Sequence, residues 1–304
     1  MSLPPVIHDI DERWTMAYAA AFGDHSDRYL DTTRLDGVVA HPLFPVGPEW
    51  AAIVASRSMS EPLGMTHAEV LTGVHATHDL IVHRLVRPGD RLSTRLSIVG
   101  ITDISPGAKV TTRLTTVDQH GQPVATTTQD AIYLGVPTDN VDHPDPTPPP
   151  AISSPERRGE PVVTIVDVAA GAAHVYTECA RIWNPIHTDR SVAQASGLRD
   201  NVLHGTATLA HGITAVINHR ADGEPELVRR IAGRFAAMVE LPSAITVKVW
   251  PGNATPDGNM TVPFEVYNAA GVAAVRDGLV VLARSSNHAR PQERDQLATQ
   301  VIRP

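Results

Sequence analysis

The chain has 304 residues, of which 42% are hydrophobic and 19% are charged, and its formal net charge is −8. This composition is that of an ordinary globular protein, and the length allows one large or two medium domains. The acidic balance argues against nucleic acid or an anionic membrane surface as the main partner. A single cysteine, Cys179, leaves no internal disulfide and no cysteine-cluster metal site.

The first residues and the lengths of the apolar runs indicate where in the cell the protein is expected to lie. The first residues show no basic segment followed by an apolar run, so we expect no secretory leader. No apolar run approaches the roughly 18 residues that a membrane helix needs. We therefore expect a cytoplasmic protein with no membrane partner and no nucleic-acid partner.

The first half, residues 1–135, predicts helices followed by long strands. Residues 41–56 begin with a histidine and continue at helical spacing, and residues 91–101 alternate as a strand does. Residues 117–134 read as a hairpin of two strands around the turn residue Gly121. The same order of elements returns in the second half.

A proline-rich connector, residues 136–161, separates this half from residues 162–284, and a polar tail, residues 285–304, follows. Proline fixes the backbone φ angle and removes a hydrogen-bond donor, so the connector is expected to be extended. The sequence therefore predicts two units joined by a linker.

The second half repeats the pattern of the first. A histidine followed by helical spacing recurs at 204–217, a strand at 243–252, and a hairpin around Gly271 at 266–282. "HSDR" at 25–28 also recurs as "HTDR" at 187–190. Matches in the same order predict a duplicated α+β unit. The helix that follows His204 is apolar nearly all round, so we expect a sheet to wrap around it.

A candidate site lies in "NPIHTD" (184–189) and "LHGTATLA" (203–210). His187 has an unperturbed pKa near 6.5, which suits proton transfer at neutral pH. Gly205 is expected at a helix N-terminus, where backbone N–H groups stabilise a developing oxyanion. Asn184 and the proline after it are expected to stiffen the loop that carries the histidine, Asn184 through side-chain-to-backbone hydrogen bonds and the proline through its fixed φ.

These motifs resemble the MaoC-like (R)-specific enoyl-CoA hydratase/dehydratase family, double-hot-dog type, and the resemblance spans about residues 10–283. It implies a continuous antiparallel sheet wrapped around two central helices, with a degenerate N-terminal unit and the active site in the C-terminal unit. It also implies reversible addition of water to a 2-enoyl thioester, with acyl-CoA or an acyl-carrier thioester as substrate, no further cofactor and no metal. In the family an Asp and a His hold a water, and the Gly amide binds the thioester carbonyl.

The sequence departs from this pattern at two positions: the family's Asp, five residues before the His, is Ile182 here, and a Ser often found 26 residues after the His is Ile213. Three carboxylates are candidates to replace the Asp. Glu178 lies one helical turn before Ile182, and its alternative role is that of a solvated carboxylate on a helix. Asp24 comes from the other half, and its alternative role is that of a helix N-cap or turn residue. Asp189 belongs to the motif but is expected to serve the loop's structure.

The substrate is expected to be lined by a further set of residues: Ile182, Asp189, His204, Thr206 and His75. We expect His204 to cap the buried helix or to bond the backbone, not to act as a catalyst. His75, His78 and His83 are not expected to bind a metal, because positions on a strand share a face only with a period of two.

Three functions remain open at this stage. The first is a hydratase or dehydratase with a rearranged acid/base pair. The second is a protein that binds or transforms acyl thioesters without hydration, for example on polyketide or carrier-bound acyl groups. The third is a thioesterase, because one fold hosts several activities. A homodimer is possible in each case.

Overall fold

The computed structural model describes residues 3–59, 64–138 and 156–284. The helices are α1 (Glu12–Ala20), α2 (Asp27–Leu30), α3 (Val46–Ser56), α4 (His67–Val70), α5 (Ala172–Ala180), α6 (Arg190–Ala195) and α7 (Gly205–Arg220), with short 3₁₀ turns η1 (Arg57–Met59), η2 (Pro185–His187) and η3 (Pro225–Leu227). The strands are β1 (Val6–Asp9), β2 (Gly73–Val82), β3 (Arg91–Ile104), β4 (Gly107–Val117), β5 (Pro123–Leu134), β6 (Val162–Val168), β7 (Val228–Phe235), β8 (Ser243–Val249), β9 (Asn253–Ala254), β10 (Met260–Tyr267) and β11 (Ala273–Leu282).

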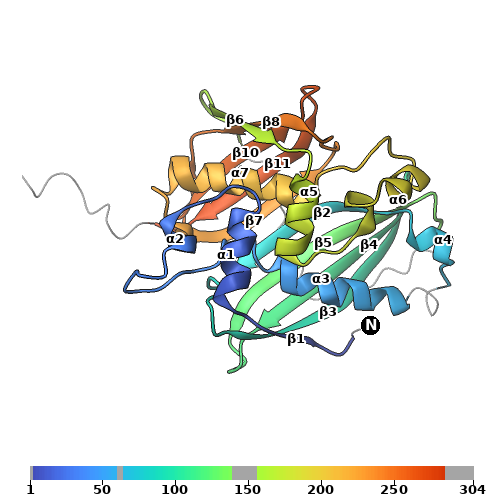
Figure 1. Ribbon diagram of the computed structural model, residues 1–304, viewed down its shortest axis with the longest axis horizontal. Coiled ribbons are helices and arrows are strands. Elements are labelled where there is room, and N and C mark those ends of the chain that lie inside the picture. Colours follow the sequence, from blue (N-terminus) through green and yellow to red (C-terminus); the bar gives the residue numbers. More distant parts are fainter. Residues whose placement is uncertain (1–2, 60–63, 139–155, 285–304) are drawn as a thin grey trace, which may run out of the picture.

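All of the described strands belong to one antiparallel sheet (Figure 1). Its order is β1-β3-β4-β5-β2-β7-β11-β10-β8-β6, and the short strand β9 pairs with β10. The first five strands come from the N-terminal half and the last five from the C-terminal half, in mirrored order. The order predicted by the repeat, two similar units with two long hairpins, is confirmed.

The two units meet where β2 pairs with β7. Thr77 to Ile81 oppose Arg234 to Arg230 in antiparallel register. Across this junction Arg230 donates two hydrogen bonds to the carboxylate of Asp79, at 2.8 and 2.6 Å. Both side chains are mostly buried, so the pair is screened less by solvent than a surface ion pair. Strand pairing and this ion pair make the two units one continuous layer.

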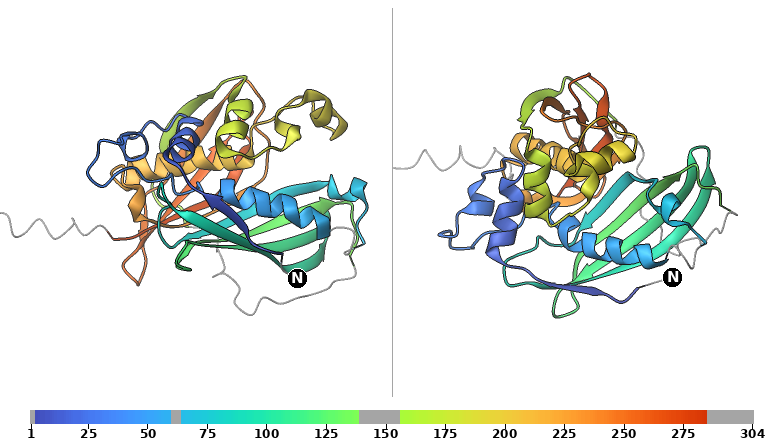
Figure 2. Two further views of the ribbon diagram at one scale, coloured as in Figure 1. Left: turned by 60° about the horizontal axis from the view of Figure 1, so that its bottom comes forward. Right: turned by 45° about the vertical axis from the view of Figure 1, so that its right-hand side comes forward.

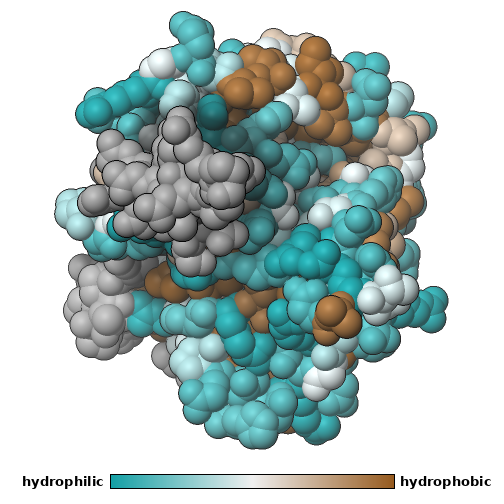
Figure 3. Space-filling model, turned by 90° about the vertical axis from the view of Figure 1, so that its left-hand side faces the viewer, coloured by the Kyte–Doolittle hydropathy of each residue, from teal (hydrophilic) through white to brown (hydrophobic). Residues whose placement is uncertain are grey.

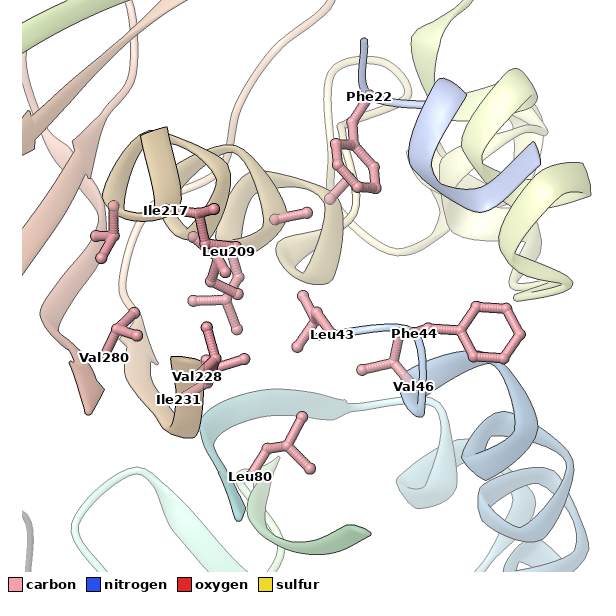
Figure 4. Close-up of a cluster of buried hydrophobic side chains, with 14 of the residues drawn as sticks. Phe22, Leu43, Phe44, Val46, Leu80, Leu209, Ile217, Val228, Ile231 and Val280 are labelled. Atoms are coloured by element: carbon pink, nitrogen blue, oxygen red, sulfur yellow. The ribbon is translucent and has the colours of Figure 1, made fainter. Parts of the chain in front are cut away.

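Helices α3 and α7 lie on the same side of the sheet, each over its own unit (Figures 1 and 2). Figure 4 shows Leu209 and Ile217 of α7 above Val228, Ile231 and Val280 of the sheet. These five side chains are at most 3% exposed. The predicted burial of the helix after His204 is therefore confirmed, because its apolar faces contact the sheet.

The first helix of the repeat starts later than its sequence pattern suggests. His41 is followed by turns, and α3 begins only at Val46 with Pro45 as its N-cap. Proline has no backbone N–H to donate and its fixed φ suits the first positions of a helix. Helix α7 has no such interruption and begins directly after its histidine.

The surface is mixed. The face in Figure 3 is mainly hydrophilic, with hydrophobic side chains gathered in separate patches. Within the described part of the chain, no helix has the length and apolar character needed to cross a membrane. Most of the predicted linker and all of the predicted tail, residues 139–155 and 285–304, lie outside the described residues.

Candidate active site

The N-terminus of α7 forms the centre of the candidate site. His204 is the N-cap, with extended backbone, and its side chain makes no capping hydrogen bond. The amides of Gly205, Thr206 and Ala207 precede the first intrahelical bond, which Thr208 donates to the His204 carbonyl. Such amides carry partial positive charge and have no partner within the helix. They are suitable donors for the oxygen of a thioester.

His187 ends the 3₁₀ turn η2 and is oriented by one hydrogen bond. Its Nδ1 lies 2.9 Å from the carbonyl oxygen of Val202. A carbonyl only accepts, so Nδ1 carries the proton and Nε2 carries the lone pair. Nε2 has no hydrogen-bond partner among the described residues. Burial lowers the pKa of His187, which the Val202 carbonyl partly opposes, so the neutral form prevails at neutral pH.

The ring of His204 packs against one face of the His187 ring. The two imidazole rings are stacked, with centroids 3.7 Å apart and planes 25° from parallel. His204 is 2% exposed, and its Nε2 lies 3.2 Å from the hydroxyl of Thr177. Burial, with the neighbouring His187, lowers the pKa of His204 to about 2. A neutral ring in this place fixes the plane of His187. The predicted cap bond is absent; the ring bonds the Thr177 side chain, stacks on His187 and lies against the backbone of Ile182.

Two tyrosines complete the buried side of the site. The hydroxyl of Tyr176, in α5, donates to Thr206 at 3.1 Å. It also lies 3.3 Å from the hydroxyl of Tyr18 in α1, which donates to the Leu43 carbonyl. Burial raises the pKa of Tyr176 to about 12, so this group is a poor acid near neutrality. The hydroxyls hold Thr206 in place and link the two units.

The N-terminal unit approaches the site through β2. A Cβ on Gly205 would lie 3.0 Å from the ring of Phe235, so a side chain at 205 would be tightly confined. The His75 ring packs on Phe235, with centroids 4.7 Å apart, and on the His78 ring at 5.6 Å. His75 thus lies one ring away from Gly205, near the substrate position for which the sequence made it a candidate.

The expectation that these histidines face different sides of the strand is wrong for one pair. A β-bulge between His75 and Thr77 breaks the period of two and brings His75 beside His78. His83 is separate and bonds Thr126. Among the described residues no group of three or more His, Cys, Asp or Glu is arranged to hold a metal ion.

The carboxylates near the motif do not face His187. Glu178 is exposed on α5, and its carboxylate accepts a hydrogen bond from the indole of Trp183 at 3.4 Å. Asp189 is exposed and caps α6 by accepting from the amides of Ser191 and Val192. Glu178 is therefore placed as a surface carboxylate, and Asp189 as a structural one.

The position of the missing Asp is apolar. Ile182 is 6% exposed and belongs to the main hydrophobic cluster. Its amide bonds the Thr177 carbonyl, and its carbonyl accepts from the amide of Asn184. The Asn184 carbonyl in turn accepts from the amide of His187. Asn184 therefore shapes the loop through its backbone, and the expected side-chain bond to the backbone is not formed at the start of η2.

Asp24 lies in a different part of the molecule. It accepts a 2.7 Å hydrogen bond from Thr214, which is ten residues after His204 in α7. Ten helical residues span about 15 Å. Asp24 is therefore too far from His187 to share one water with it. A role for Asp24 opposite His187 does not fit the structure.

A small pocket of about 140 Å³ opens beside the site. Its lining includes Val202, whose carbonyl orients His187, together with Arg199 and Met238. Val202, Phe235 and Thr177 could not be identified from the sequence, because a backbone carbonyl, a packing ring and a buried hydroxyl have no motif of their own.

Two mirrored units in one antiparallel sheet, each with a central helix on the same side, define a double hot-dog protein. Residues 160–272 match the MaoC like domain, and residues 5–127 match the FAS1-like dehydratase domain region. The C-terminal unit thus belongs to the MaoC like domain family, and the N-terminal unit to the FAS1-like dehydratase domain region.

Curated relatives are consistent with this membership. The peroxisomal enoyl-CoA hydratase 2 of Arabidopsis thaliana is 21% identical over 263 residues, which cover 82% of this chain and 84% of the relative. Enoyl-CoA hydratase ChsH3 of Mycobacterium tuberculosis is 32% identical over 100 residues, 33% of this chain and 31% of the relative.

Solved structures show the same fold. A MaoC-like dehydratase from Phytophthora capsici superimposes with a TM-score of 0.77 at 18% identity, covering 93% of this chain and 97% of that one. A Mycobacterium tuberculosis protein described as having a double hot-dog fold gives a TM-score of 0.61 at 17% identity, with 93% and 95% covered.

Proposed function

We propose that the chain adds water reversibly to a 2-enoyl thioester, and that His187 is the only titratable side chain of the reaction. The proposal is carried by one observation: the ring of His187, oriented by the Val202 carbonyl, stacks on His204, the N-cap residue directly before the amides that start α7. The curated relatives include enzymes named as enoyl-CoA hydratases, which supports the substrate class.

One base is sufficient for a syn addition. His187 Nε2 takes a proton from water, and the resulting hydroxide forms a bond to C3 of the enoyl group. Electrons move to the thioester oxygen, where the amides of Gly205 and Thr206 stabilise the enolate. The imidazolium then returns the same proton to C2. Dehydration follows these steps in reverse.

The absence of an Asp beside His187 should lower the rate of this reaction. Ile182 cannot hold the water, so its position depends on His187 and on the substrate. General acid/base groups each contribute about 10²–10⁴-fold in rate. We therefore expect turnover slower than that of an enzyme with both groups, and a site that favours apolar acyl groups near Ile182.

The test is a spectrophotometric assay of the purified full chain with short, medium and branched 2-enoyl-CoA substrates. We expect loss of the enoyl absorbance in the wild type and none in His187→Ala. Thr188→Ala is the matched control and should retain activity, because the Thr188 side chain makes no hydrogen bond to the described residues of the site. An active His187→Ala variant, or a wild type inert on the whole panel, would refute the proposal.

A second candidate is favoured by the buried Ile182 alone: a protein that binds acyl thioesters without converting them. Acyl-CoA would then raise the melting temperature with no turnover, because ligands that bind only the native state stabilise it. Release of free CoA thiol in the same assay would instead indicate a thioesterase.

A further inference from the structure

The N-terminal unit contains a counterpart of the candidate active site. Tyr18 and Tyr176 contact each other across the interface of α1 and α5, as equivalent residues near a two-fold axis do. Counting from this pair, Gly23 corresponds to Arg181, and both have positive φ, 78° and 58°. The next residue is Asp24 in one unit and Ile182 in the other.

The equivalence continues through the following turn. The helical turn α2 and the turn η2 each begin four residues after the positive-φ residue. Tyr29 thereby takes the place of His187. Its ring lies 5.6 Å from that of His41, as His187 stacks on His204. The sequence match of "HSDR" with "HTDR" is therefore out of register, because its residues are 162 positions apart whereas Tyr18 and Tyr176 are 158 apart.

A hydrogen-bond relay is built around Asp24. The amide of Leu43 donates to Nδ1 of His41, so the proton of this ring lies on Nε2. Nε2 lies 3.4 Å from the Thr214 hydroxyl, which donates to Asp24 at 2.7 Å. Asp24 is 7% exposed, and burial raises its pKa. The acidic residue of the family motif is thus present in the unit that lacks the histidine.

A larger cavity lies on this side of the molecule. Its volume is about 330 Å³, room for roughly ten waters, and its lining includes Leu85 and Glu226. Leu85 packs against the buried cluster of Ala19, Tyr29 and Val39, and the Tyr29 hydroxyl is buried with no hydrogen-bond partner among the described residues. An unpaired buried hydroxyl costs free energy unless something satisfies it. Burial raises the pKa of Tyr29, and the charges of Asp24 and of the lining residue Glu226 raise it further, so Tyr29 lies near both carboxylates.

The charge of the cavity lining is positive. Glu226 is paired with Arg28, and Arg84 is paired with Asp90 and Asp118. These pairs leave the guanidinium groups of two further arginines available for a ligand.

Arg87 and Arg229 also line the cavity, and neither has an acidic partner within ion-pair distance in the described chain. Backbone carbonyls hold them in place: Arg87 donates to Asp36, and Arg229 to Glu226 and Val228. Each guanidinium keeps further N–H donors for a planar, multiply charged anion.

We propose that this cavity is a second ligand site, in which Arg87 and Arg229 bind the phosphates of a phosphorylated acyl carrier such as coenzyme A. The ligand is chosen on the proposed function, but the site itself is carried by the cavity, the two arginines and the symmetry of the units. The carrier's free end points toward Tyr29, which holds the place that His187 has in the other unit.

The test is isothermal titration of the full chain with coenzyme A at low ionic strength. We expect two molecules per wild-type chain and one per Arg87→Ala/Arg229→Ala chain, with Kd at the affected site raised about tenfold for each arginine lost. Both arginines are exposed, so the double variant should fold, which circular dichroism checks. Arg95→Ala, an exposed arginine of β3, is the matched control.

Each other outcome has a defined meaning. One molecule per chain, bound equally by wild type and double variant, overturns the second site and leaves hydration by His187 intact. Equal weakening by Arg95→Ala overturns it too, since binding would then follow net charge. Two-site binding without enoyl turnover sustains the second site while the proposed function fails. Inhibition of the second event by pyrophosphate would assign recognition to the phosphates; no inhibition would contradict the role of the arginines.

Discussion

Replacing Ile182 with Asp tests the chemistry of the candidate site directly. The substitution restores a carboxylate at the position where the family has its Asp, two residues before Asn184. Because the Ile182 side chain is 6% exposed, the new carboxylate would be desolvated and its pKa raised above the usual Asp value. Such a group is suited to hold and activate a water beside His187.

The magnitude follows from burial and from the value of a second catalytic group. Removing a buried isoleucine side chain and burying a polar one should lower the free energy of unfolding by about 3 kcal/mol. A typical domain has about 5–15 kcal/mol, so Ile182→Asp should still fold. Addition of a second acid/base group should raise kcat/KM for enoyl-CoA hydration by about 10²–10⁴-fold.

The assay is hydration of 2-enoyl-CoA, measured below the melting temperature of each variant. Ile182→Asn is the matched control, because it has nearly the same shape and polarity but cannot ionise. We expect the Asp variant to exceed both the wild type and the Asn variant. An Asp variant no faster than the Asn variant would show that position 182 does not face the reacting water, and the one-base scheme would lose its explanation.

Three further predictions concern single residues. His78 is 1% exposed, and neither of its ring nitrogens has a hydrogen-bond partner in the described chain. His78→Leu should therefore raise the free energy of unfolding, measured by denaturant titration, by about 1–3 kcal/mol. A lower free energy of unfolding would mean that the ring nitrogens do have hydrogen-bond partners. Burial raises the pKa of Glu49 to about 7, so the folded state keeps a proton on this group that the unfolded state has lost, and the contribution of Glu49 to the free energy of unfolding should fall between pH 4.5 and about 7, which is measured as the difference between the wild type and Glu49→Gln. Glu49→Gln, which still accepts from Thr127, should remove that slope in melting curves, and an unchanged slope would contradict the assignment. Gly205→Ala should reduce enoyl-CoA turnover. Its Cβ would press on Phe235 while alanine favours the helix, so the free energy of unfolding should change by no more than about 1 kcal/mol. Full activity would argue against close approach of the thioester to this amide.

The fold could be predicted because its signals are periodic and repeated. Alternating strands, turn glycines at 121 and 271 and an apolar helix after a histidine recur in the same order, and all are found in the structure. The pairing of β2 with β7 follows from these units, since each alone would leave an unpaired edge. Local pattern and tertiary packing agree at these positions.

The candidate site was only partly predictable. His187 and Gly205 were identified from their motif, and they lie together because both flank the start of α7. The search for a replacement carboxylate could not succeed from spacing alone. Glu178 is one turn from Ile182 along the chain, yet the helix places its side chain on the surface. The distance of Asp24 from His187 depends on which end of α7 the loop that carries Asp24 contacts.

The Asp79–Arg230 junction also has an evolutionary consequence. In a homodimer of single units, any substitution appears twice, so both symmetry-related clefts must change together. Here the two halves are encoded separately but locked into one sheet, and a mutation alters one cleft only. Such a protein is free to keep a base in one half and an acid in the other, and to select them for different tasks.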